Sequence, residues 1–276
     1  MMLKQRLITA AILIPLVVLA ILKLPTHVLQ WFIAGVTLLA AWEWFAIVGI
    51  HSVLQRSISF ISLIAAAVCV SLYIPPDIIV LIGAVVWLLA TLLVFRFAHI
   101  ALPTSIARIF ADKYFGFFVA LMVLVPFWFS AISLHQFSSL GPQQLLYVMV
   151  TVWLADTGGY FAGKRWGKQP LAKIISPNKT WQGVYGALVL VGIWALVAYK
   201  LGINDQLPLI TWLVLTLITA LISIVGDLFE SLFKRSHQVK DSGNLLPGHG
   251  GILDRIDSLL AAVPIFVAGL LMLGTV

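Results

Sequence analysis

Residues 78–95 read IIVLIGAVVWLLATLLVF, an apolar run without a single charged side chain. About 20 mostly apolar residues are enough for a helix to cross the hydrocarbon core of a bilayer. Asp77 and Arg96 bound the run and mark where the chain leaves the apolar region. The stretch therefore predicts a transmembrane helix, and it sets the class of fold for the chain around it.

Similar runs recur on both sides of this stretch, so we expect about nine membrane-spanning helices. They lie near 7–24, 28–48, 58–74, 78–95, 114–133, 145–162, 184–201, 209–225 and 258–275. We interpret the first run as a retained helix, because no small-residue cleavage site precedes Pro25. The predicted fold is an all-α polytopic integral membrane protein, with residues 1–276 forming a single membrane-embedded domain.

The composition agrees with this class. Apolar residues make up 62% of the 276 residues and charged residues 10%, whereas soluble domains have about 45–50% and about 25%. A soluble globular protein is therefore excluded. The one cysteine, Cys69, lies in an apolar run, which argues against a disulfide framework or a thiolate metal site.

The basic residues predict the orientation of the helices. With a cytoplasmic amino terminus, all of the 17 lysines and arginines except Lys23 and Lys200 fall at cytoplasmic ends or loops, as the positive-inside rule requires. The carboxyl terminus is then outside. This topology explains the net charge of +7, so the expected partner is the lipid bilayer and no nucleic acid is expected.

Two predicted cytoplasmic loops carry most of the polar chemistry. The loop at 163–183 has five basic residues, and the loop at 226–257 contains Asp227, Glu230, Asp241, Asp254 and Asp257. We therefore expect residues 144–276 to carry the active site and the helices within 1–143 to be mainly scaffold.

The acidic loop is spaced as two helix ends. Asp227 and Glu230 share one helix face if the preceding helix continues past Val225, and Asp254 and Asp257 repeat the spacing on the next helix. Carboxylates of this kind, together with substrate phosphates, suit Mg²⁺, and a pair of metal ions is one option. The alternative is a solvated charge cluster in which the acids pair with basic neighbours. Those neighbours are Lys234, Arg235 and Arg255.

The basic loop ends at the start of a helix. Ser176 or Asn178 is the expected helix cap, and Lys179 and Thr180 beside free backbone amides make an anion site plausible. A positive loop is also what membrane topology alone demands, so the alternative to a phosphate site is a loop whose charge only sets the topology.

Two acids lie inside apolar runs, Glu43 and Asp156. An acid within a membrane span is costly and points to function by default. Asp156, which is followed by two glycines and Tyr160, is the better functional candidate, while a structural Glu43 is as plausible as a functional one. His249 lies between glycines and is a candidate for contact with a phosphate or sugar.

Residues 231–257, SLFKRSHQVKDSGNLLPGHGGILDRID, resemble the signature of the bacterial phosphatidate cytidylyltransferase (CDP-diacylglycerol synthase) family. The segments DTGGY at 156–160, SPNKTWQG at 176–183 and GDL at 226–228 resemble further family segments in the same order. The resemblance implies transfer of CMP from CTP to phosphatidate, which gives CDP-diacylglycerol and pyrophosphate at the cytoplasmic face of the bacterial inner membrane.

The resemblance also implies roles for single residues. Expected metal ligands are Asp227, Asp254, Asp257 and Asp241, with Glu230 a lesser candidate and Mg²⁺ as the metal. Expected catalytic residues are Asp227, Asp254, Lys240 and Arg255. Expected substrate-binding residues are Ser176, Lys179, Thr180, Asp156, His249, Lys234 and Arg235.

Two other functions are compatible with these sequence features. A secondary transporter of an anionic substrate would also contain intramembrane acids, but its site would lie near the midplane between repeated halves. A lipid kinase acting on polyprenol or phytol would have the same need for metal and nucleotide. A homodimer is a further option.

Overall fold

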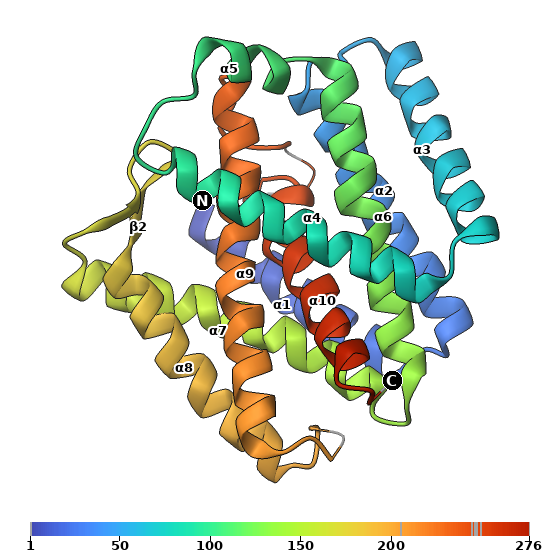
Figure 1. Cartoon of the computed structure of the whole chain (residues 1–276), viewed down its shortest axis with the longest axis vertical. Coiled ribbons are helices and arrows are strands. Elements are labelled where there is room, and N and C mark those ends of the chain that lie inside the picture. Colours follow the sequence, from blue (N-terminus) through green and yellow to red (C-terminus); the bar gives the residue numbers. More distant parts are fainter. Residues whose placement is uncertain (1, 205, 244, 246–247, 249, 276) are drawn as a thin grey trace.

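The computed structural model describes residues 2–204, 206–243, 245, 248 and 250–275, with side chains from residue 9 onward. The chain forms a helical bundle with one small hairpin (Figure 1). The first half contains α1 (Met2–Lys23), α2 (Thr26–Ile47), α3 (Val53–Tyr73), α4 (Pro76–Phe97), α5 (Thr104–Phe110) and α6 (Lys113–Phe137). The second half contains α7 (Gly141–Trp166), β1 (Pro170–Ala172), β2 (Ser176–Thr180), α8 (Trp181–Lys200), α9 (Leu209–Ser236) and α10 (Leu253–Met272).

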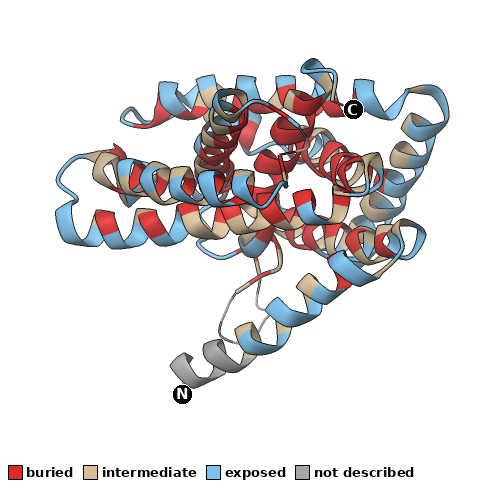
Figure 2. Cartoon of the chain, turned by 90° about the horizontal axis from the view of Figure 1, so that it is seen from below, coloured by how far each residue is buried: buried red, intermediate tan, exposed pale blue. Residues whose placement is uncertain are grey.

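The expected membrane class is confirmed. Eight described helices are long and apolar enough to cross a bilayer, namely α2, α3, α4, α6, α7, α8, α9 and α10. The apolar part of α1, Thr9–Lys23, is shorter, and its carboxyl-terminal end packs in the bundle, where Ala20 and Ile21 are buried and α1 contacts α7. Figure 2 shows the described part of the helix running from there toward the outside of the bundle. The count of nine spans and the orientation of both termini stay predictions.

The centre of the bundle is formed around α10. Its side chains are mostly buried, and α10 contacts α9, α4, α6, α7 and α2, so it lies among the other helices in Figure 1. Phe266 of α10 packs edge-on against Trp212 of α9, with ring centroids 5.8 Å apart, and both side chains are fully buried. In contrast, α3 buries only Leu63 among its described residues, which leaves an apolar surface suited to lipid.

Small residues join α7 to α8. A Cβ atom on Gly158 would lie 2.7 Å from the carbonyl oxygen of Gly186, and one on Gly183 would lie 2.9 Å from that of Gly159. Close backbone approach of this kind is typical of helix pairs in membranes. The glycines that follow Asp156 are therefore packing residues, and they hold the start of α8 against α7.

Candidate active site

A short hairpin and a helix start form one wall of the site. Strands β1 and β2 pair antiparallel between α7 and α8, an element that the sequence pattern did not predict. Thr180 ends β2 and caps α8, since its Oγ1 accepts a hydrogen bond from the Gly183 amide at 3.2 Å. The expectation that Ser176 or Asn178 caps this helix is wrong, because the strand continues through both residues.

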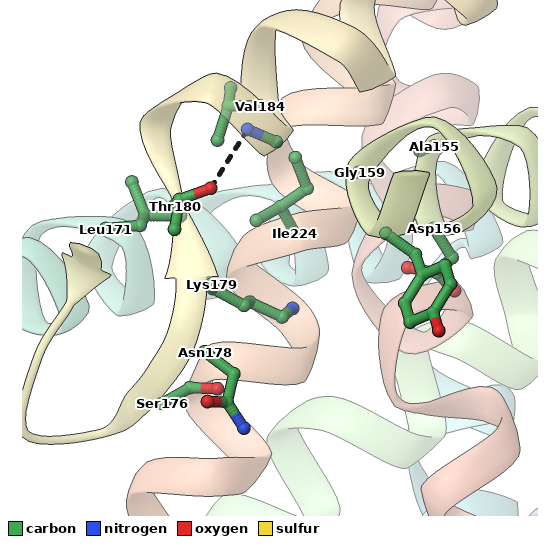
Figure 3. A pocket seen from close by; sticks show the side chains of 12 residues that line it. Ala155, Asp156, Gly159, Leu171, Ser176, Asn178, Lys179, Thr180, Val184 and Ile224 are labelled. Atoms are coloured by element: carbon green, nitrogen blue, oxygen red, sulfur yellow. Dashed lines mark hydrogen bonds between the residues drawn. The ribbon is translucent and has the colours of Figure 1, made fainter. Parts of the chain in front are cut away.

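This wall faces a cavity of about 310 Å³. It is lined from α7 by Asp156 and from the hairpin side by Ser176, Asn178, Lys179 and Thr180. Figure 3 shows Lys179 extending from β2 toward the side where Asp156 lies, with Ile224 of α9 above Lys179 in this view. The cavity therefore combines one cationic side chain, one acid and several short polar groups over an apolar floor.

The Lys179 ammonium contacts a carboxylate of α9. Its Nζ lies 2.6 Å from Oδ2 of Asp227, and the two side chains are 25% and 29% exposed. Ser231, one turn further along α9, donates its hydroxyl to the other Asp227 oxygen at 3.3 Å. Asp227 is thus held in place while solvent still reaches the pair.

Asp257 of α10 lies beside this pair because the two helices touch there. A Cβ atom on Gly226 would be 2.6 Å from the carbonyl oxygen of Asp257, so glycine allows this approach. Asp227, Asp257 and Glu230 are close enough for their charges to interact. The continuation of α9 past Val225 to Ser236 confirms the geometric condition on which the predicted acidic face depended.

Lys234 forms a second, more buried cluster. Its ammonium contacts Glu230 and lies 2.8 Å from Oδ1 of Asp254, and the three side chains are at most 11% exposed. Asp254 also accepts hydrogen bonds from the amides of Gly251 at 2.9 Å and Ser242 at 3.1 Å. The alternative interpretation of the acidic loop predicts that its acids pair with Lys234, and the structure contains this pairing. The pair is buried, however, whereas that interpretation places it in solvent.

The expected metal ligands are not gathered into one group. Within the part of the chain that the structure describes, no three or more His, Cys, Asp or Glu side chains are arranged to hold a metal ion. Asp254 turns both oxygens to Lys234 and the loop amides, and Asp241 is exposed. Metal ligation by the predicted set stays a prediction.

The remaining candidates lie at the periphery. Lys240 and Arg235 are exposed. Arg255 is also exposed and is near enough to Asp156 for their charges to interact. His249 lies outside the described residues.

Sequence reasoning missed two members of the site. Tyr160 and Asn178 both line the cavity. Their positions within the quoted segments DTGGY and SPNKTWQG were the available signal, but neither was given a role in the pocket.

The chain is similar to known proteins along its whole length. A family model described as "Cytidylyltransferase family" matches residues 4–273. A phosphatidate cytidylyltransferase of Pseudomonas aeruginosa is 38% identical over 270 residues, covering 97% of this chain and 96% of that protein. The protein of the same name in Haemophilus influenzae is 34% identical over 286 residues, covering 96% and 97%. One in Bacillus subtilis is 43% identical over 133 residues, covering 48% and 49%.

Proposed function

Since this chain belongs to the cytidylyltransferase family, we propose that it transfers CMP from CTP to phosphatidate in the Asp156 cavity. An oxygen of the lipid phosphate attacks the α-phosphorus of CTP, and the bond from that phosphorus to the β-phosphate breaks. The products are CDP-diacylglycerol and pyrophosphate. Such chemistry depends on positioning and charge neutralisation, because the attacking phosphate is already ionised.

The observation that carries this proposal is the Lys179–Asp227 pair at the cavity wall. A phosphate entering the cavity meets a lysine that is already extended into it. We expect the ammonium to exchange part of its contact with Asp227 for a phosphate oxygen. The hydroxyls of Ser176 and Thr180 and the amide of Asn178 are within the same lining and can donate hydrogen bonds to the nucleotide.

The donor set also suits one divalent cation. Gly226 lets the Asp257 end of α10 approach α9 next to Asp227, and Mg²⁺ commonly binds one or two carboxylates together with substrate phosphates. Asp227 and Asp257 would hold the metal, with Asp254 and Asp241 as further predicted ligands. When bound, Mg²⁺ would neutralise charge on the phosphates of CTP.

We place the site at the cytoplasmic face of the bacterial inner membrane. At this face, water-soluble CTP can reach the site from the cytoplasm, and the lipid phosphate can reach it from the bilayer. The concentration of basic residues in the loop at 163–183 favours this orientation. A homodimer is a prediction that the mass of the purified protein in detergent would test.

The activity is tested with CTP labelled in two positions. Purified protein is incubated with phosphatidate, Mg²⁺ and CTP that carries ³²P at either the α- or the γ-phosphate. We expect the α-label in the lipid and the γ-label in pyrophosphate. A γ-label in the lipid would indicate a kinase instead, and no labelled lipid with either substrate would favour a transporter.

A further inference from the structure

Glu43 links the first half of the chain to the loop between α9 and α10. It lies on α2 and is 6% exposed. Its Oε2 accepts a hydrogen bond from the Leu253 amide at 2.8 Å and another from the Ser242 hydroxyl at 3.1 Å. These partners are 210 and 199 positions away in the sequence, so the contact is entirely tertiary.

The carboxylate takes the place of a missing helix cap. Leu253 is the first residue of α10, and the residue at the cap position, Ile252, makes no side-chain cap hydrogen bond. The first amides of a helix need acceptors, and a negative charge beside them is favourable. Glu43 of α2 therefore supplies from another helix what the local sequence of α10 lacks.

Two described glycines of the loop lie close to this carboxylate. A Cβ atom on Gly243 would lie 2.6 Å from Oε1 of Glu43, and one on Gly251 would overlap Oε2. These two glycines thus approach the acid as closely as glycine allows.

The same loop residues hold Asp254. Ser242 gives its hydroxyl to Glu43 and its amide to Asp254, and the Gly251 amide also donates to Asp254. Asp254 in turn contacts Lys234 of α9. The Glu43 carboxylate is therefore joined to the acidic ends of α9 and α10 through the loop backbone.

We propose that Glu43 is a positioning residue for the reaction, which fixes the loop and the first turn of α10 so that Asp254 and Asp257 keep their places beside α9. This inference rests on the proposed function. It assigns a direct part in building the site to a helix within 1–143, a region that is expected from the sequence to be mainly scaffold.

The test compares three variants of the full chain in detergent. Glu43→Ala removes the acceptor, Glu43→Gln keeps an acceptor oxygen without the charge, and Thr37→Val is the matched control. Thr37 is also buried on α2, but its hydroxyl donates to Ile33 of the same helix. Turnover per folded enzyme and amide hydrogen exchange over residues 242–258 are measured for each.

We expect Glu43→Ala to lower turnover by about 100-fold, the scale of a misplacement near 1 Å, and to speed exchange in 242–258 but not in α6. Glu43→Gln should recover most of both, and Thr37→Val should match the wild type. Wild-type turnover in Glu43→Ala, or lost turnover with unchanged exchange in 242–258, would overturn the proposal. An inactive wild type would refute the proposed function alone, because the exchange comparison then decides the role of Glu43.

Discussion

Lys179 and Lys234 each pair with acids, but the Lys179 pair is more exposed to solvent than the Lys234 cluster. Replacing the two lysines should therefore have different effects on stability and turnover. The Lys179–Asp227 side chains are 25% and 29% exposed. Lys234 is 11% exposed, and its partners Glu230 and Asp254 are 3% and 10% exposed. Replacing each lysine by methionine keeps an unbranched apolar stem and removes the ammonium.

The stability effects should differ in size. Lys234→Met leaves Glu230 without its cation in a buried position, and breaking a buried pair in this way costs about 3–5 kcal/mol. Lys179→Met breaks a solvated pair, for which about 0–1 kcal/mol is usual. The effect on turnover should be large for Lys179→Met, because Lys179 lines the cavity. Loss of one donor that stabilises a developing charge costs about 2.7–4 kcal/mol, which is about 100- to 1,000-fold in turnover.

Both quantities are measurable on the same preparations. The free energy of unfolding is followed by titrating detergent-solubilised protein with sodium dodecyl sulfate, and turnover is followed with labelled CTP per folded molecule. The double variant Lys234→Met/Glu230→Gln is the control, since removing the unpaired charge should restore part of the lost stability. The reasoning fails if Lys234→Met unfolds like the wild type, or if Lys179→Met is equally destabilising or retains full turnover.

Three further results are expected. Gly226→Ala should cost about 1–3 kcal/mol and lower turnover, because its Cβ would lie 2.6 Å from the Asp257 carbonyl oxygen; unchanged unfolding and activity would contradict this close approach. Asp156→Asn should lower turnover with little change in unfolding, since Asp156 is an exposed side chain of the cavity, and an active variant would remove it from the site. Chelation of divalent cations should stop pyrophosphate release and added Mg²⁺ should restore it, whereas persistent release in chelator would argue against the metal.

Much of the site could be anticipated from local patterns. The spacing of Asp227 and Glu230 required only that α9 continue, and it does so to Ser236. Lys179 and Thr180 are predicted to form an anion site near a helix start, and the family resemblance adds Ser176; all three line the cavity, while phosphate binding by them stays a prediction. The continuation of α9 could be anticipated because helical periodicity is a property of a short segment.

Residues whose partners are remote in the chain were harder to assign. Lys234 was expected to contact substrate, yet its ammonium lies between Glu230 and Asp254. Nothing near Glu43 in the sequence indicates Ser242 or Leu253 as its partners. Local pattern alone therefore does not decide between a structural and a functional role for Glu43. The hairpin of β1 and β2 was missed because its strands are only three and five residues long.

The sequence by itself determined the membrane class, the approximate places of the helices and the segments that carry polar chemistry. Hydrophobic runs and charge distribution act locally, and the bilayer imposes the same length requirement on each run. Only the tertiary structure decided which acid of another element each lysine meets, because Lys179 on β2 and Lys234 on α9 reach partners that no local pattern places beside them. Asp227 with Lys179, and Asp254 with Lys234, are the outcome of the tertiary packing.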